Sequence, residues 1–304
     1  MTIPVSRSRR TFPVAFLLLL MAASSVVFGQ GDDPVIKIDS ATVLLNATIL
    51  DTEGNVVSGL RREQFSVFEN GRKQEISYFS TAETPFAGVI LIDTSGSMEA
   101  RLSMARSAAI TFLDGLRTDD NVAVYRFASK VELVQEFSGS RDISEAIFDV
   151  KADGMTALND AVFKAAEELK ARHEKRKAII VISDGADTIS GRSAERALKA
   201  ALDAQALIYT IDMSGIESGM KDRMQNQGVL KNFAEKSGGR FIAAQGGQAL
   251  RLGLQGIVDE LGIQYTLGYE PADQQRDGKW RAIELRVAKP KLTIRTRKGY
   301  TAEK

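Results

Sequence analysis

The five residues Asp93-Thr94-Ser95-Gly96-Ser97 combine one carboxylate with two hydroxyls on a short turn. Asp93, Ser95 and Ser97 offer hard oxygen ligands, which suit Mg²⁺, Mn²⁺ or Ca²⁺ and do not suit zinc. Gly96 allows the backbone to bend between the two serines. The spacing therefore indicates a site for a hard divalent cation. A second interpretation stays open, in which Ser97 only caps the following helix by accepting hydrogen bonds from its first-turn amides.

Two later segments offer further oxygen ligands. Ser183-Asp184-Gly185 ends an apolar run and places a second carboxylate, Asp184, where a strand is expected to finish. Gly154-Met155-Thr156-Ala157-Leu158 opens a helix and offers a third hydroxyl at Thr156. Thr156 also has a simpler interpretation, as the cap of the helix that begins near Leu158.

An alternation of strands and helices from Phe86 to Leu261 must position these side chains. Gly88–Ile92 and Ala178–Ser183 are continuous apolar runs, typical of parallel strands buried on both faces. Apolar residues recur with helical spacing in Glu99–Leu116 and Leu158–Arg172. The other expected elements are strands at 121–127, 131–137, 206–211 and 241–243, and helices at 141–150, 193–205, 229–236 and 248–261. The fold class is therefore α/β, with a doubly wound, mainly parallel sheet whose carboxyl edge binds ligands.

Both flanks of this region have the pattern of β-structure. Residues 35–80 contain the apolar run Val43–Leu50, the alternating strand Phe65–Phe68, a hairpin turn at Asn70-Gly71 and a return strand, Gln74–Phe79. The tail offers strands at 265–269, 280–287 and 292–296. We expect the two flanks to form one small β-domain. Two separate β-appendages are the alternative.

The N-terminus has the pattern of a secretory signal peptide. Arg7, Arg9 and Arg10 precede the apolar run Phe12–Ala23, and small residues follow as far as Gly29. We expect cleavage after residue 29 and a periplasmic or secreted protein. An uncleaved membrane anchor is the alternative. The segment Phe12–Gly29 has 18 residues and includes Pro13 and two serines, so it is marginal against the roughly 20 apolar residues that a membrane helix needs. No later segment has transmembrane length.

Composition excludes several classes of site. The 304 residues include no cysteine and a single histidine, His173, which excludes disulfides, thiolate nucleophiles and iron–sulfur clusters and leaves almost no ligands for structural zinc. Loss of residues 1–29 would remove three of the 40 Lys and Arg residues and none of the 39 Asp and Glu residues, leaving a net charge of −2. That balance gives no reason to expect binding to nucleic acid or to an anionic membrane surface.

Taken together and in this order, the oxygen ligands resemble those of the von Willebrand factor type A domain, which has a Rossmann-like fold. Its metal-ion-dependent adhesion site uses an Asp-x-Ser-x-Ser turn, a Thr from a second loop and an Asp from a third, matched here by Asp93, Ser95, Ser97, Thr156 and Asp184. The flanks, including Tyr265–Tyr269 and Arg297–Tyr300, resemble the related family common in acidobacteria. We therefore expect a signal peptide at 1–29, a β segment at 30–85, the type A domain at 86–261 and a second β segment at 262–304.

The resemblance also implies a function. In such a site the hydroxyls and carboxylates hold Mg²⁺, Mn²⁺ or Ca²⁺, and an Asp or Glu side chain of a protein partner fills the open position. We therefore expect an exported protein that is not an enzyme and that mediates metal-dependent protein–protein binding or adhesion. A structural envelope protein with a silent metal site is the alternative. A metal-dependent hydrolase is a weaker alternative, because the sequence has neither a Gly-x-Ser-x-Gly elbow nor a P-loop. Glu99 and Asp187 lie near the site in sequence. We expect both to be solvated acids at helix starts, and the alternative is that either one supports a metal ligand through a hydrogen bond.

Overall fold

The fold is described from a computed structural model of the chain. The structure describes residues 42–81, 84–139, 152, 154–214, 220–244 and 246–302, without the side chain of Asp222. All of them belong to one compact unit, Asp39–Lys304. The expected signal peptide and the expected helix at 141–150 lie outside the described residues, as does Asp153.

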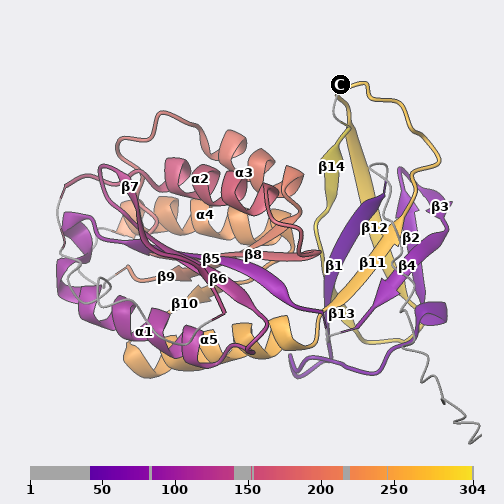
Figure 1. Cartoon of the computed structure of the whole chain (residues 1–304), viewed down its shortest axis with the longest axis horizontal. Helices are drawn as coiled ribbons and strands as arrows, with labels where there is room; N and C mark the ends of the chain where they lie inside the picture. The colour runs from indigo at the N-terminus through magenta and orange to yellow at the C-terminus, as the bar shows by residue number, and fades with distance from the viewer. Residues whose placement is uncertain are drawn as a thin grey trace, which may run out of the picture. The chain divides into compact units, whose positions relative to one another are not determined.

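A six-stranded sheet forms the centre of the α/β region, in the order β10-β9-β8-β5-β6-β7 (Figure 1). Its strands are β5 (Phe86–Asp93), β6 (Asn121–Phe127), β7 (Val131–Ser138), β8 (Arg176–Ser183), β9 (Ala206–Asp212) and β10 (Phe241–Ala243). All neighbours pair in parallel except β7, which lies antiparallel at one edge. Every residue of β5 is buried, as expected for a strand covered on both faces. The predicted α/β class with a mainly parallel sheet is confirmed.

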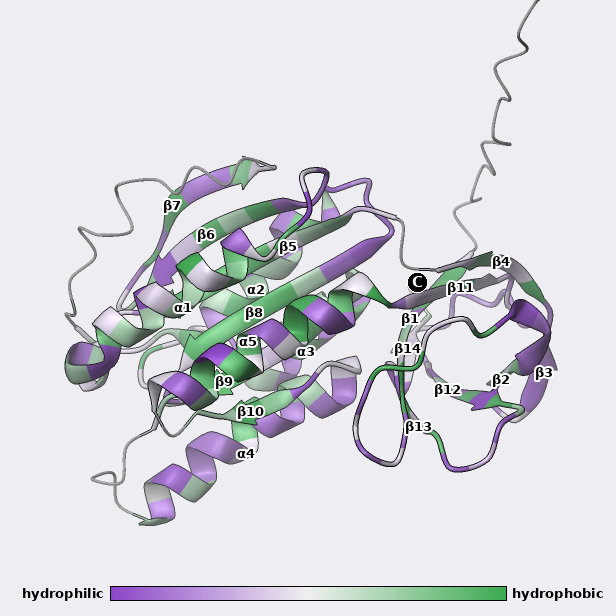
Figure 2. Ribbon diagram, turned by 90° about the horizontal axis from the view of Figure 1, so that it is seen from below, coloured by the Kyte–Doolittle hydropathy of each residue, from purple (hydrophilic) through white to green (hydrophobic). Residues whose placement is uncertain are grey.

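Helices cover the two faces of this sheet. Helices α1 (Leu102–Asp114) and α5 (Gly247–Gly262) pack on one face, whereas α2 (Leu158–Lys170), α3 (Ala194–Asp203) and α4 (Met220–Ser237) pack on the other. Side chains of β5 alternate between the two cores, because successive residues of a strand point to opposite faces: Ile90 and Ile92 join the first core, and Val89 and Leu91 join the second. Figure 2 shows β8 as a largely hydrophobic strand between these layers.

The flanks of the chain combine into a β-region of two four-stranded sheets, β13-β1-β11-β4 and β14-β12-β2-β3. Its strands are β1 (Val43–Leu50), β2 (Phe65–Glu69), β3 (Arg72–Gln74), β4 (Ile76–Ser80), β11 (Tyr265–Tyr269), β12 (Trp280–Val287), β13 (Thr293–Arg295) and β14 (Gly299–Thr301). N-terminal β1 pairs with C-terminal β11 and β13, and N-terminal β2 pairs with C-terminal β12. The expected β-region shared by the two flanks is present, whereas the exact domain boundaries stay predictions.

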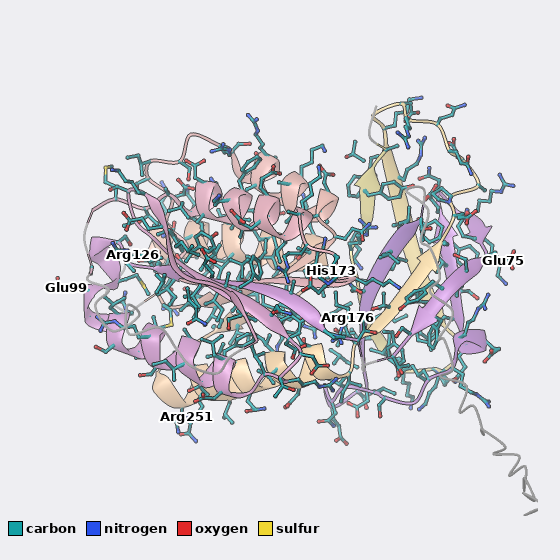
Figure 3. All side chains as sticks on the ribbon, viewed as in Figure 1. Glu75, Glu99, Arg126, His173, Arg176 and Arg251 are labelled. Atoms are coloured by element: carbon teal, nitrogen blue, oxygen red, sulfur yellow. The ribbon has the colours of Figure 1, made fainter. Side chains whose placement is uncertain are left out.

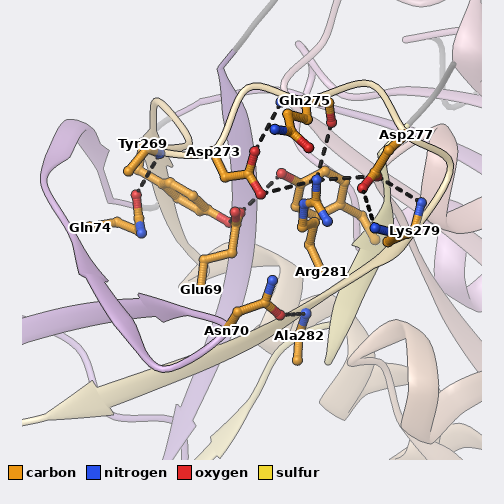
Figure 4. Close-up of polar contacts among 12 residues, drawn as sticks. Glu69, Asn70, Gln74, Tyr269, Asp273, Gln275, Asp277, Lys279, Arg281 and Ala282 are labelled. Carbon is orange, nitrogen blue, oxygen red and sulfur yellow. Dashed lines mark hydrogen bonds and ion pairs between the residues drawn. The ribbon is translucent and has the colours of Figure 1, made fainter.

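Polar contacts connect the two sheets of this β-region and hold the loop before β12 (Figure 4). Buried Glu69 accepts hydrogen bonds from the hydroxyl of Tyr269 at 2.7 Å and from that of Tyr300 at 3.0 Å. Buried Arg281 contacts Asp273 and Asp277 of the loop before β12, each at 3.2 Å. Burial raises the pKa of the Tyr269 hydroxyl, so it remains a hydrogen-bond donor across the ordinary pH range.

Several expected boundaries are wrong, and each has a tertiary cause. Gln74–Phe79 is not one strand, because the chain pairs with β2 as far as Gln74 and then joins β11 in the other sheet as β4. The helix expected from Glu99 begins as a 3₁₀ turn, η2 (Gly96–Arg101), before α1. The helix expected at 229–236 extends back to Met220. Strand β14 was not predicted from the sequence. The hairpin turn is confirmed, since Asn70 and Gly71 both have positive φ, as a type I′ turn requires.

Candidate metal site

Asp93 ends the central strand β5 and is completely buried. Its Oδ1 accepts a hydrogen bond from the backbone N–H of Ser95 at 2.9 Å, which folds the chain into a tight turn directly after the strand. Its Oδ2 accepts a hydrogen bond of 2.5 Å from the Ser183 hydroxyl, at the end of the neighbouring strand β8. The carboxylate is therefore held by its own turn and by a second strand.

The two serine hydroxyls of this turn lie next to each other. Ser95 Oγ and Ser97 Oγ are 3.1 Å apart, with Ser95 buried and Ser97 exposed, so the pair reaches from the interior to the surface. The capping interpretation of Ser97 is wrong. Ser95 is the N-cap of η2 and Arg101 is the N-cap of α1, whereas Ser97 lies within η2.

Thr156 is brought to the same edge by its backbone. The N–H of Gly96 donates to the carbonyl oxygen of Gly154 at 3.2 Å, which joins the turn of Asp93 to the loop of Thr156. The N–H of Thr156 donates to Thr188 Oγ1 at 2.9 Å, and its carbonyl oxygen accepts from the N–H groups of Thr188 at 2.8 Å and Ile189 at 3.2 Å. The backbone of Thr156 is thus fixed to the loop that follows Asp184.

The capping interpretation of Thr156 is also wrong. Helix α2 begins after Ala157, and the loop after Asp184 binds its first amides. Asp187 Oδ2 accepts from the N–H of Asn159 at 2.8 Å, and Ser190 Oγ accepts from the N–H of Asp160 at 3.1 Å. Asp187 is therefore an acid at a helix start, as expected, although the helix it caps is α2 and it reaches that helix from another loop.

Asp184 follows β8 and is mostly buried, with Oδ1 accepting from the N–H of Ala186 at 3.2 Å. The next residue must be a glycine, because Gly185 has a φ of +81° and a β-carbon there would lie 2.7 Å from the carbonyl oxygen of Asn226 in α4. Glu99 is exposed, and Figure 3 shows it pointing away from the ribbon.

Two acidic side chains lie close enough at this edge for their charges to interact. Burial raises the pKa of the Asp93 carboxyl to about 6, hydrogen bonds from Ser183 and Ser95 oppose that rise, and the nearby charge of Asp184 adds to it. Among the residues that the structure describes, no group of three or more His, Cys, Asp or Glu side chains is arranged to hold a metal ion. The candidate ligands predicted from the sequence are two carboxylates and three hydroxyls. These hard, mostly neutral oxygens suit Mg²⁺ or Mn²⁺.

Sequence reasoning missed two polar residues at this edge. The sequence pattern predicts no role for Ser183, yet its hydroxyl donates to Asp93 and accepts from the N–H of Gly185 at 2.9 Å. It predicts none for Thr188 either, although Thr188 Oγ1 accepts from the N–H of Thr156. The only local signal for Ser183 is a hydroxyl at the end of an otherwise apolar strand.

Comparison with known proteins identifies the α/β region. Residues 89–186 match the von Willebrand factor type A domain family, and this range contains all five candidate ligands. The central region is a von Willebrand factor type A domain. A solved structure titled von Willebrand factor type A, from Catenulispora acidiphila, has a TM-score of 0.51 at 14% identity and covers 87% of this chain and 75% of that chain. At this identity the likeness supports the fold alone.

Curated relatives match part of this chain and a smaller part of their own length. An uncharacterised Synechocystis protein is 28% identical over 158 residues, covering 49% of this chain and 35% of that protein. Bovine inter-alpha-trypsin inhibitor heavy chain H3 is 23% identical over 200 residues, covering 61% of this chain and 22% of that protein. The chain thus spans about a third or less of these two relatives.

Proposed function

We propose that this protein binds a protein partner through a divalent cation, Mg²⁺ or Mn²⁺. The ligands would be Asp93, Ser95, Ser97, Thr156 and Asp184. One observation carries the proposal: three separate loops bring hydroxyls and carboxylates to the carboxyl edge of the sheet, and hydrogen bonds join each loop to another. Sites held by such contacts keep their geometry without the cation, which lowers the cost of binding it.

The donor set also supports the class of partner. When bound, the cation would act as an electrophile that attracts a further oxygen ligand. Three of the five proposed ligands are neutral hydroxyls, so only the two carboxylates can offset the positive charge of the cation. Ser97 is exposed, so a ligand can approach from solvent on its side. An acidic side chain of a protein partner fits both features.

A hydrolase is less well supported than a binding protein. Hydrolysis at this site would need a general base beside the cation. The single histidine, His173, precedes β8 and therefore lies at the opposite end of that strand from Asp184, with a side chain that is 90% exposed. Figure 3 shows Glu99 and His173 toward opposite ends of the α/β region. We therefore propose a binding role without catalysis.

Export is part of the proposal and rests on the sequence of residues 1–29. In the described ranges, no helix is both long enough and apolar enough to cross a membrane. The structural-envelope alternative, with a silent cation site, shares this location. The two proposals differ only in whether partner binding requires the cation.

Calorimetric titration with Mg²⁺, followed by pull-down from an envelope extract with and without EDTA, tests the proposal. Asp93→Ala should abolish both cation binding and cation-dependent capture, and Ser95→Ala should weaken them less because water can replace one hydroxyl. Asp114→Ala, an exposed aspartate at the end of α1, is the matched control and should change neither. Capture unaffected by EDTA and by Asp93→Ala would favour the structural alternative.

A further inference from the structure

Large apolar side chains are exposed around the carboxyl edge of the sheet. Two of them, Met155 and Ile189, are 52% and 45% exposed. Met155 directly precedes Thr156, and the N–H of Ile189 donates to the carbonyl oxygen of Thr156 at 3.2 Å. Both residues are therefore immediate neighbours of a candidate ligand, where a surface that only contacted water would favour polar side chains.

Helix α4 contributes two more exposed apolar residues. Leu230 is completely buried against the sheet, and one turn earlier Gln227 Nε2 donates to Asp212 Oδ2 at 2.7 Å, at the end of β9. Met224 and Met220 continue this stripe toward the start of the helix, at helical spacings of three and four residues. They lie beyond the end of β9 and are 69% and 81% exposed. Figure 2 shows the first turns of α4 extending past the strand ends.

We propose that Met155, Ile189, Met220 and Met224 form an apolar rim that binds apolar side chains on either side of the partner's acidic residue. This inference rests on the proposed function and specifies the partner as a protein segment with Asp or Glu at its centre and aliphatic or aromatic neighbours. Charge complementarity determines the residue at the centre of the partner segment, because the cation would bind a carboxylate. Three of the four rim residues are methionines, whose flexible, polarisable side chains adapt to irregular apolar surfaces.

The cation and the apolar rim would contribute differently to partner binding. A carboxylate on a cation fixes position but gives little discrimination among acidic partners, since every Asp or Glu offers the same group. Burial of exposed apolar side chains adds affinity in proportion to the area removed from water. The rim would therefore select among acidic segments by the residues beside the acid.

A displayed library of linear heptapeptides with a fixed central Asp and six random positions tests the rim. The immobilised full chain selects peptides in Mg²⁺, and EDTA elutes them. We expect Leu, Ile, Met and Phe to be enriched beside the aspartate. The variant with all four rim residues changed to Ser should still yield EDTA-eluted peptides but without that enrichment, and its affinity for selected peptides should fall about tenfold or more.

Leu252→Ser is the matched control, because Leu252 is 66% exposed on α5, in the opposite helical layer, and should leave the enrichment unchanged. The rim variants change exposed side chains, and calorimetric Mg²⁺ binding equal to that of the unaltered chain checks that the cation site is intact. Two results would refute the role of the rim without contradicting the proposed function. Either the EDTA-eluted peptides show no enrichment of apolar residues, or the rim variant selects peptides with the same enrichment. No EDTA-eluted peptides at all would overturn both.

Discussion

The hydroxyl of Ser183 donates a hydrogen bond of 2.5 Å to Asp93 Oδ2, across the adjacent parallel strands β8 and β5. Ser183 Oγ also accepts a hydrogen bond from the N–H of Gly185 at 2.9 Å, so the side chain of Ser183 connects Asp93 to the loop of Asp184. A contact of this kind fixes the direction of a ligand without occupying a coordination position. Ser183 is thus a positioning residue for both candidate carboxylate ligands.

Ser183→Ala should lower the affinity for Mg²⁺ about tenfold, since loss of a partner behind a metal ligand typically costs 10- to 100-fold. Isothermal titration calorimetry measures the change. Ser107→Ala removes a hydroxyl that bonds only its own helix, to the carbonyl oxygen of Ser103, and serves as the control. Equal Mg²⁺ affinities for the two variants would show that Ser183 does not position Asp93.

Thr188→Val should also weaken Mg²⁺ binding, because Val keeps the shape of Thr but leaves the N–H of Thr156 without its acceptor at 2.9 Å. Loss of this partly buried hydrogen bond should reduce the free energy of unfolding by about 1 kcal/mol. Thr188→Ser retains the hydroxyl and should restore the Mg²⁺ affinity. If Thr188→Ser binds Mg²⁺ as weakly as Thr188→Val, the loss of affinity comes from altered packing and not from the lost hydrogen bond. Titration calorimetry and urea denaturation of both variants distinguish the two cases.

Arg297 connects the β-region to the type A domain. Its guanidinium is buried and donates to the carbonyl oxygens of Leu44 in β1 at 2.7 Å and of Leu202 in α3 at 3.2 Å. Burial lowers the pKa of this guanidinium, while nearby Tyr269, Tyr300, Asp203 and Glu69 oppose the shift.

Arg297→Leu should lower the free energy of unfolding by about 3 kcal/mol, because two buried carbonyl oxygens lose their donor. Urea denaturation measures the change. Arg286→Ala removes an exposed arginine that pairs with Glu284 on β12 and should change stability by less than about 1 kcal/mol. Comparable destabilisation by both variants would argue against a specific role for Arg297.

Export predicts a mature N-terminus at or near Gln30. Mass spectrometry of the protein isolated from its native envelope or medium checks this directly, because the basic segment and apolar run before residue 30 would be missing. Substitution of Phe12–Ala23 with a polar segment should retain the protein in the cytoplasm. An intact Met1 in a cytoplasmic fraction of the unaltered strain would contradict export.

The sequence by itself determined the centre of the fold and the residue types of the candidate site. Strands β5 and β8 are apolar on both faces, a pattern that only a sheet covered by two helical layers can bury. Asn70-Gly71 specified its hairpin through its own backbone preferences. Asp93 ends one apolar strand and Asp184 follows another, so strand direction alone predicted that both carboxylates lie at the carboxyl edge of the sheet.

Only the tertiary structure decided how these elements connect. Ile76–Ser80 separates from β3 because it pairs with β11, whose Tyr269 is far along the chain from Ile76. The first turns of α4 expose Met220 and Met224 instead of burying them in the core, and Gln227 of the same helix donates to Asp212 of β9. Thr156 is not needed as a cap because Asp187 and Ser190 bind the amides of α2 from 28 and 30 positions away. Hydrogen bonds between residues so distant have no local pattern, since their formation depends on the folded path of the chain.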